Sequence, residues 1–318
     1  MPELPDTMRA VVATAAGGPD VLELREVPRP SPGPGEVLIR VAAAGINPVD
    51  LKTRQGAGAT RFLGEHPFPW IPGWDLAGTV VEAGWGVARF GVGDRVFGTV
   101  GFPHAAGAYA EYAVAHVSQL SRSPANLDDV HTAAMAMGGL TAWQAMADAG
   151  GLETNQRVLI TAASGGVGHL AVQIAADLGA HVLALCSPDN VDFVRGLGAH
   201  EILDRTREDW AAGIDPVDLV LDGHGGPARR AALPLVRPGG TIVTLPSGAE
   251  NDPAPEGVRD PWVYVAPDGL ELQLLTGTVV RGGLRPHVSA TFALEDAAQA
   301  HELVGGGATR GKVVLTVG

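Results

Sequence analysis

A glycine-rich turn between a short apolar run and an amphipathic segment is the most specific chemical signal in the sequence. The run Val158–Ile160 leads into Ala162-Ala-Ser-Gly-Gly-Val-Gly168, a variant of the three-glycine dinucleotide fingerprint with alanine in first place. A buried strand, a tight turn and a helix in this order offer unpaired backbone N–H groups to a pyrophosphate. We therefore predict a dinucleotide site, with a turn used only for packing as the alternative. The turn residues assigned to the cofactor are Ala163, Ser164, Gly165, Gly166 and Val167.

The residues after the next apolar run indicate which dinucleotide is preferred. The run His181–Cys186 ends at Ser187, about 20 residues beyond the turn, where NAD-preferring sites carry an acid for the ribose hydroxyl groups. A small hydroxyl side chain at Ser187 leaves room for a 2′-phosphate, so NADPH is predicted. Asp189 is interpreted as a turn or helix-capping acid after a proline. Arg195 lies well along the following helix, so the sequence offers no obvious arginine for the phosphate.

The elements that must position this turn follow an alternating pattern. From about residue 125 to 277, short apolar runs separated by helical stretches predict an α/β domain with a doubly wound parallel sheet of the Rossmann type. Residues 1–124 and 278–318 instead show short strands punctuated by glycine and proline, with one amphipathic helix over Leu294–Val304. We expect residues 1–124 and 278–318 to form one discontinuous β-rich domain around a nucleotide-binding domain of residues 125–277. The strands expected in the nucleotide-binding domain are Val158–Ile160, His181–Cys186, Leu219–Leu221, Thr241–Leu245 and Trp262–Val265.

Composition excludes several classes of partner and compartment. The 318 residues are 46% hydrophobic and 18% charged, which is typical of a compact protein of two domains. A net charge of -13 opposes binding to nucleic acid. Cys186 is the only cysteine, so neither an intrachain disulfide nor a thiolate zinc cluster can form. Met1–Thr7 lacks the features of a signal peptide, and no apolar run approaches the roughly 20 residues that span a bilayer, so we expect a cytoplasmic protein with no membrane partner.

Six further segments resemble the medium-chain dehydrogenase/reductases. Together with the glycine turn they are most similar to the zinc-independent, zeta-crystallin-like quinone oxidoreductases, and the resemblance spans nearly the whole chain after Thr7. It implies a GroES-like catalytic domain beside the Rossmann domain, an active site in the cleft between them, and a homodimer. The segments are Ala42–Asp50, Pro72–Gly84, Gly91–Gly98, Gly107–Tyr112, Gly139–Trp143 and Arg310–Thr316.

The positions that hold catalytic zinc in zinc-dependent members of this superfamily carry other residues here. Asn47 resembles the cysteine position, and Gly73-Trp74-Asp75 resembles the Gly-His-Glu segment. An indole cannot ligate zinc, and an amide is a poor substitute for a thiolate. The cysteines of a structural zinc lobe are missing, and none of the ten histidines forms a close His-x-x-x-His pair, so no metal site is expected.

Four residues are candidates for contact with the substrate or the nicotinamide. Asn47 could donate a hydrogen bond to a forming oxyanion, although asparagine before Pro48 is also typical of a helix N-cap. Asp50 could relay a proton, or it could organise the local backbone or pair with an arginine. The resemblance places Thr141 beside the nicotinamide, and the alternative is an ordinary helix residue. Lys312, at a sharp entry to the last strand, could contact the cofactor or substrate, or it could face solvent.

An enzyme without zinc lacks the Lewis acid that assists alcohol oxidation. A conjugated acceptor needs less help, because it delocalises the charge that hydride transfer creates. We therefore expect an NADPH-dependent oxidoreductase that transfers hydride to a quinone or another α,β-unsaturated carbonyl compound. The catalytic candidates are Asn47, Asp50 and Thr141, and the cofactor candidates outside the turn are Asn47, Thr141, Ser187, Leu245 and Lys312.

Two alternatives remain open. The first is an enoyl-thioester reductase. Some such reductases of the superfamily carry a tyrosine just after the asparagine segment, whereas Lys52–Thr60 contains none, so water is the default proton source. A cofactor-binding protein of the same fold with little catalysis is the other alternative, because fold alone does not determine function. Tyr109 and Tyr112 are interpreted as core or edge-strand aromatic residues.

Overall fold

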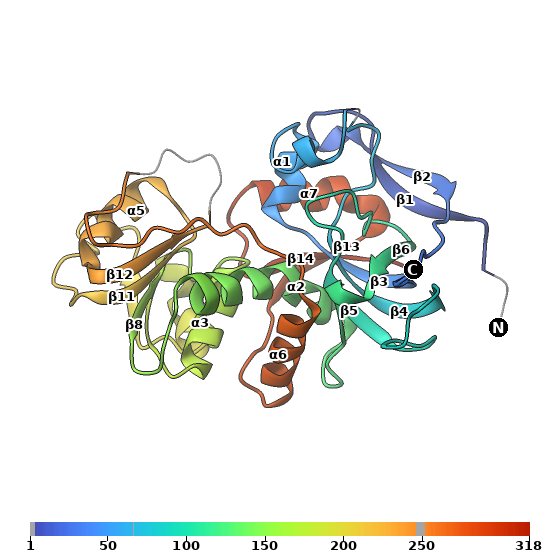
Figure 1. Ribbon diagram of the computed structural model, residues 1–318. Coiled ribbons are helices and arrows are strands. Elements are labelled where there is room, and N and C mark those ends of the chain that lie inside the picture. Colours follow the sequence, from blue (N-terminus) through green and yellow to red (C-terminus); the bar gives the residue numbers. More distant parts are fainter. Residues whose placement is uncertain (1–3, 66, 246–251) are drawn as a thin grey trace. The chain divides into compact units, whose positions relative to one another are not determined.

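The computed structural model describes residues 4–65, 67–245 and 252–318 and consists of two compact units. Unit 1 comprises residues 1–137, 266–280 and 286–318, and unit 2 comprises residues 138–265 and 281–285. Figure 1 shows the blue start and the red end of the chain together in the β-rich unit, and a sheet flanked by helices in the other. The expected α/β fold class, with one β-rich domain and one parallel-sheet domain, is confirmed.

Unit 1 is built on a seven-stranded sheet with the order β13-β14-β3-β4-β5-β7, in which β6 also pairs with β3. Its strand pairs are antiparallel, apart from the parallel pair β13 and β14. Strands β1 and β2 form a separate antiparallel ribbon. The strands are β1 Thr7–Ala13, β2 Leu22–Pro28, β3 Glu36–Gly45, β4 Asp75–Ala83, β5 Arg95–Thr99, β6 Tyr112–His116, β7 Leu120–Arg122, β13 Val288–Ala293 and β14 Lys312–Thr316. The helices are α1 Pro48–Arg54, α6 Gly269–Val280 and α7 Ala297–Gly305, and α2 Asp129–Trp143 begins in this unit.

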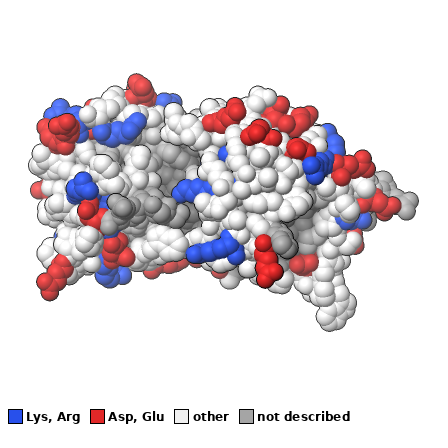
Figure 2. All heavy atoms as spheres, turned by 90° about the horizontal axis from the view of Figure 1, so that it is seen from above, with Lys and Arg blue, Asp and Glu red and all other residues white. Residues whose placement is uncertain are grey.

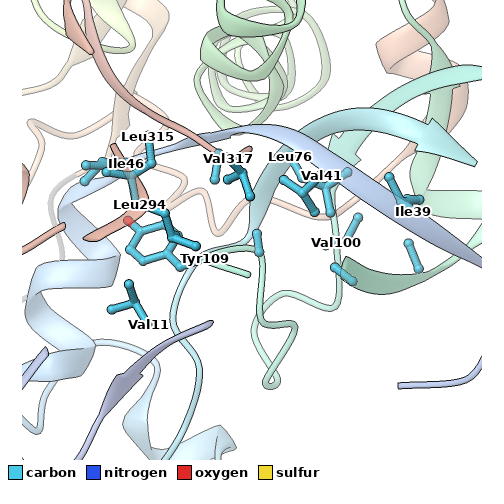
Figure 3. Packing of buried hydrophobic residues seen from close by; sticks show 14 of the residues in the cluster. Val11, Ile39, Val41, Ile46, Leu76, Val100, Tyr109, Leu294, Leu315 and Val317 are labelled. Atoms are coloured by element: carbon cyan, nitrogen blue, oxygen red, sulfur yellow. The ribbon is translucent and has the colours of Figure 1, made fainter. Parts of the chain in front are cut away.

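Apolar side chains of the sheet form the core of unit 1. On β3, Val37, Ile39 and Val41 are at most 2% exposed, whereas Arg40 between them faces solvent. Burial of each large aliphatic side chain contributes about 1.5–3 kcal/mol to folding. Figure 3 shows the ring of Tyr109 inside this cluster. Its other labelled members are Val11, Ile46, Leu76, Val100, Leu294, Leu315 and Val317.

Unit 2 is a five-stranded parallel sheet with the order β10-β9-β8-β11-β12. The strand order reverses between β8 and β11, and ligands of such sheets bind outside the carboxyl ends of the strands at this point. The strands are β8 Arg157–Ile160, β9 His181–Cys186, β10 Glu201–Asp204, β11 Val217–Asp222 and β12 Val236–Thr244. The helices are α3 Gly168–Asp177, α4 Val191–Gly196 and α5 Gly226–Ala232, and a π-helix, Gln144–Ala149, continues α2.

The expected strand Trp262–Val265 is wrong. In this segment a single isolated bridge, between Trp262 and Thr244, pairs with β12. Pro261 has no N–H to donate to a ladder. The hydrogen bonds beside it are long, at 3.3 Å from Thr244 N to Pro261 O and 3.4 Å from Val263 N to Thr244 O.

The two units divide at other positions than the expected domain boundaries near residues 124 and 277. The start of α2 belongs to unit 1, where the N–H of Met137 donates to Asp75 Oδ1 at 3.0 Å. Helix α6 also belongs to unit 1, because it packs on β7. The segment 281–285 belongs to unit 2, where Gln173 of α3 hydrogen-bonds to both the N–H and the carbonyl of Arg285.

Acidic and basic side chains are intermingled on the face shown in Figure 2. Arginines pair with nearby carboxylates, as in Arg207–Asp209 at 2.9 Å and Arg230–Asp252 at 2.8 Å. Such exposed pairs contribute only about 0–1 kcal/mol each, but they neutralise the arginines locally. Within residues 4–65, 67–245 and 252–318, no helix combines the length and apolar character that crossing a bilayer requires.

We expect Gly168→Ala to destabilise unit 2. A Cβ at position 168 would lie 2.1 Å from Ala162 O and 2.8 Å from Ala163 Cα, so the start of α3 would have to move away from the turn. Overpacking of this kind costs about 1–3 kcal/mol. Thermal unfolding should show a clearly lower Tm than in the wild type.

Gly165→Ala is the matched control. The nearest atom to its added Cβ is Ala162 O at 3.3 Å, which a small shift relieves. Its Tm should stay close to that of the wild type, and equal Tm values for the two variants would contradict the close approach at Gly168.

Candidate functional site

The glycine turn joins β8 to α3 with the geometry that a dinucleotide requires. Ala162 has a φ of 53°, and the N–H of Gly165 donates to Ala162 O at 2.9 Å, which closes the turn. Helix α3 begins at Gly168, and the side chain of its N-cap residue, Val167, makes no capping hydrogen bond. The positive end of a helix dipole, preceded by a glycine-rich turn, is the arrangement that favours an anion such as a pyrophosphate. The candidates Ala163–Val167 thus lie together at the carboxyl end of β8.

Helix α2 passes close to this turn within unit 2. A Cβ at Gly138 would lie only 3.0 Å from Gly166 O and 3.1 Å from Leu170 Cδ1. Thr141 follows three residues later, on the same face of the helix, and it is half-buried. The structure therefore places Thr141 on the face of α2 that meets the turn.

Ser187 directly follows β9. Its hydroxyl accepts a hydrogen bond from Asn190 Nδ2 at 2.9 Å. Asp189 is exposed and lies in the first turn of the short helix Pro188–Asn190, in agreement with its interpretation as a turn acid.

A cation that the sequence analysis missed lies beside Ser187. Strand β10 pairs with β9 so that Asp204 is opposite Cys186, and the N–H of Arg205 donates to Cys186 O at 2.9 Å. The exposed side chain of Arg205 therefore starts at the same edge of the sheet as Ser187. The carboxylate of Asp204 accepts bonds from the hydroxyl and N–H of Thr206 at 2.7 and 2.8 Å, which lower its pKa.

Leu245 lies at the same edge of the sheet, after β12. Its N–H donates to Asp222 O at 3.0 Å. The buried carboxylate of Asp222 accepts from the Thr161 hydroxyl at 3.2 Å and from Gly225 N–H at 2.9 Å, and the N–H of Gly223 donates to the same hydroxyl at 2.8 Å. These bonds fix the carboxyl ends of β8 and β11 to each other.

A buried polar cluster in unit 1, the lysine cluster, contains Asn47, Asp75 and Lys312, which are at most 5% exposed. Lys312 Nζ donates to Asn47 Oδ1 at 2.5 Å and to Ile46 O at 2.7 Å. Asn47 Nδ2 donates to Asp75 Oδ2 at 2.8 Å, and the ammonium lies 3.7 Å from that oxygen. The Thr99 hydroxyl donates to Asp75 Oδ1 at 2.8 Å. The solvent-facing alternative for Lys312 is therefore wrong.

Burial and mutual attraction act in opposite directions on these charges. Burial raises the pKa of Asp75, while the Lys312 ammonium and the hydrogen bond from Asn47 oppose the rise. Burial likewise lowers the pKa of Lys312, and the carboxylates of Asp75 and Asp50 oppose that fall. Each charge thus depends on its partner to remain ionised in the interior.

Asp50 organises the start of α1. Asn47 is the N-cap and Pro48 the first helical residue, and the N–H of Asn47 donates to Asp50 Oδ2 at 2.7 Å. The helix-capping interpretation of Asn47 and the backbone role of Asp50 are confirmed. Burial raises the pKa of Asp50 to about 7; the hydrogen bond from Asn47 opposes this rise, and the charge of Asp75 adds to it.

Tyr109 is a core residue with a buried polar contact. Its hydroxyl lies 3.2 Å from His301 Nε2, and His301 Nδ1 lies 3.5 Å from Arg54 Nη1. Burial and the Arg54 charge lower the pKa of His301 to about 3, and burial raises the pKa of Tyr109 well above its usual value. Both side chains are therefore neutral near pH 7.

The structure gathers the sequence candidates into two groups. Asn47, Asp50 and Lys312 meet in unit 1, whereas Thr141, Ser187, Leu245 and the glycine turn belong to unit 2. The sequence analysis gave Asp75 no role beyond replacing a zinc ligand. Its position at the head of the buried run Asp75–Val80 was the available signal, because a charge in such a run requires a partner.

Two family models match the chain. The family model described as alcohol dehydrogenase GroES-like domain matches residues 33–125, and the one described as zinc-binding dehydrogenase matches residues 197–315. The mitochondrial NAD(P)H oxidoreductase RTN4IP1 of Danio rerio is 32% identical, over 89% of this chain and 84% of that protein. The 2-haloacrylate reductase of a Burkholderia species is also 32% identical, over 96% of this chain and 98% of that protein.

Solved structures give the same result. The quinone oxidoreductase from Coxiella burnetii superposes with a TM-score of 0.91 at 33% identity, over 98% of this chain and all (100%) of that one. A mycobacterial protein in complex with NADPH superposes with a TM-score of 0.84 at 28% identity, over 97% of this chain and 99% of that one. The chain therefore belongs to the medium-chain dehydrogenase/reductase superfamily, in its quinone-oxidoreductase-like family of oxidoreductases.

Proposed function

We propose that the chain is a zinc-independent, NADPH-dependent oxidoreductase that transfers hydride to the conjugated double bond of a quinone or another α,β-unsaturated carbonyl compound. The observation that carries this proposal is the lysine cluster, in which an amide and an ammonium replace a metal-binding set. The names of two relatives support the substrate class, since one is a quinone oxidoreductase and the other reduces 2-haloacrylate, a conjugated acid.

The residues at the positions that resemble zinc ligands do not fit zinc. The indole N–H of Trp74 donates to His104 O at 2.7 Å, and Asn47 Oδ1 faces the Lys312 ammonium at 2.5 Å. A cation at that oxygen leaves no place for a second one. In the part of the chain that the structure describes, no three His, Cys, Asp or Glu side chains gather as a metal site requires. The proposed reaction therefore uses no metal ion.

The cofactor site fits a nicotinamide dinucleotide, which supplies the hydride when bound. We assign the pyrophosphate to Ala163–Val167 and the 2′-phosphate to Ser187 and Arg205. The Ser187 hydroxyl and the Arg205 guanidinium, at the ends of β9 and β10, can both donate hydrogen bonds to a phosphate, while the carboxylate of Asp204 already accepts hydrogen bonds from Thr206. The remaining cofactor candidates are Asn47, Thr141, Leu245 and Lys312.

Asn47 is the donor that we assign to the oxygen of the acceptor. Its Nδ2 carries two hydrogens, of which Asp75 accepts one, so a second is left to stabilise developing negative charge. Asp50 already accepts the N–H of Asn47, and Tyr109 is neutral beside His301. We therefore assign the proton that completes the reduction to water.

The location and the partners stay predictions. We propose that the protein is a cytoplasmic homodimer that binds a small-molecule substrate. We expect it to bind neither nucleic acid nor membrane. Enoyl thioesters are the competing substrate class. NADPH oxidation measured with quinones, 2-alkenals and enoyl thioesters tests the assignment, and turnover of enoyl thioesters alone would replace it.

Loss of the Arg205 guanidinium should lower the efficiency with NADPH and spare that with NADH. A charge-assisted hydrogen bond contributes about 1.5–3 kcal/mol. Arg205→Gln is therefore expected to lower kcat/KM for NADPH roughly 10- to 100-fold and to leave kcat/KM for NADH nearly unchanged. Ser187→Asp should act in the same direction, because a carboxylate repels the 2′-phosphate.

Arg207→Gln is the matched control for this prediction. Arg207 is an exposed arginine two residues further along, paired with Asp209. Its removal should change neither kcat/KM value. A wild-type enzyme that favours NADH, or equal effects of the two arginine variants, would refute the NADPH assignment.

Asn47→Ala should lower kcat by about 10²-fold, the lower range for loss of one oxyanion donor, and leave the Kd of NADPH nearly unchanged. Asp50→Asn keeps an acceptor for the N–H of Asn47 and should cost much less, as should Tyr109→Phe. Deuterium from C4 of labelled NADPH should appear at the β carbon of an enone product. Label lost to solvent, or a folded but inactive Tyr109→Phe variant, would contradict this mechanism.

A further inference from the structure

The side-chain amide of Asn47 lies between two partners of opposite hydrogen-bonding character. An ammonium is only a donor, and an ionised carboxylate is only an acceptor. Lys312 Nζ at 2.5 Å therefore requires the oxygen of the amide, and Asp75 Oδ2 at 2.8 Å requires its nitrogen. The two contacts specify one of the two possible orientations of the amide.

We propose that Lys312 is a positioning residue, which fixes the Asn47 amide so that the free hydrogen of Nδ2 is presented to the acceptor oxygen. This inference rests on the proposed function and assigns Lys312 a role other than contact with the cofactor. With the ammonium and the carboxylate both in place, a flipped amide would set its oxygen against Asp75 Oδ2 and its N–H groups against the ammonium.

The main chain around Lys312 holds the ammonium in place. The N–H of Lys312 donates to His287 O at 2.9 Å. The main chain of Ile46, the residue before Asn47, is held at both of its polar groups, because Ile46 N–H donates to Val313 O at 3.1 Å while Ile46 O accepts from Lys312 Nζ at 2.7 Å. One residue pair of β14 thus fixes both the backbone and the side chain at the start of α1.

Removal of the ammonium changes the hydrogen-bonding possibilities of the cluster. Asp75 is completely buried and the Lys312 ammonium lowers its pKa, so loss of this cation raises that pKa and favours a protonated carboxyl, which is a donor as well as an acceptor. A protonated Asp75 can donate to Asn47 Oδ1, which turns the Nδ2 hydrogens away from their former direction. Lys312→Met, which keeps the length of the side chain, should therefore disable Asn47 without removing it.

A double-mutant cycle on kcat with an enone acceptor tests the proposal. Lys312→Met is expected to lower kcat by about as much as Asn47→Ala, about 10²-fold, and the double variant should lie within about threefold of Asn47→Ala alone. The KM for NADPH should change little. Additive losses, an unchanged kcat, or a loss confined to the KM for NADPH would overturn the positioning role.

Two further variants separate positioning from folding. Lys312→Gln retains a neutral donor for Asn47 Oδ1, so its kcat should exceed that of Lys312→Met, and the same cycle can be run with it if the methionine variant does not fold. Arg229→Met removes another buried cation, from unit 2, where Arg229 pairs with Asp260 at 2.5 Å. It should lower the Tm yet show no coupling to Asn47→Ala.

An NMR measurement separates this inference from the proposed function. The side-chain amide signal of Asn47, identified as the one missing in Asn47→Ala, should exchange slowly with solvent in the wild type and in Arg229→Met. It should shift and exchange faster in Lys312→Met. A wild type without reductase activity but with this pattern would refute the proposed function and retain the orientation of the amide; an identical amide signal in Lys312→Met would refute the orientation.

Discussion

The ion pair between Lys312 and Asp75 is the interaction on which the architecture of unit 1 converges. Asp75 begins β4, and its carboxylate accepts hydrogen bonds from Thr99 at the end of β5, from Met137 of α2 and from Asn47 at the start of α1, while Lys312 begins β14. Breaking a buried pair costs about 3–5 kcal/mol, because it leaves an unpaired charge in the interior. Five elements, four of them at their ends, are therefore tied to a single pair of charges.

The two units place the polar groups of the candidate site in different ways. Unit 2 uses backbone: the turn after β8 depends on glycine at 138 and 168, where an added Cβ would meet main-chain atoms at 3.0 and 2.1 Å. Unit 1 uses side chains, whose directions depend on donors and acceptors that match in sign. The first arrangement leaves no room for a side chain at Gly138 or Gly168, and the second depends on the opposite charges of Asp75 and Lys312.

Much of this could be predicted from local signals. The glycine turn, the parallel sheet around it and the N-cap at Asn47 each follow from neighbouring residues, since turn geometry and helix capping act over three or four positions. The apolar run Trp262–Val265 predicts a strand that does not form, because Pro261 beside it has no N–H for the ladder. Strand β10 was missed because its four half-buried residues, Glu201–Asp204, carry little apolar signal.

The contacts that give the candidate site its character could not be predicted in this way. Lys312 and Asn47 are separated by 265 positions, and Asp75 and Thr99 by 24. Nothing near Lys312 in the sequence distinguishes an interior ammonium from a surface lysine, because the difference depends on which strand lies beside β14. Arg205 likewise became visible only once β10 was found beside β9.

An ammonium between an amide and a carboxylate differs from a metal ion in what it can do for a substrate. A metal ion with an open coordination position binds the reacting oxygen directly and withdraws electrons from it. The two hydrogen bonds of Lys312 are directed to protein oxygens, so its charge reaches a substrate only through the orientation of Asn47. One oriented N–H contributes only a few kcal/mol, which is substantial help for an oxygen that carries part of a delocalised charge but small against the cost of forming a full alkoxide. In the reaction that we propose, the lysine cluster therefore suits acceptors that share the incoming charge over several atoms, which is the defining property of quinones and enones.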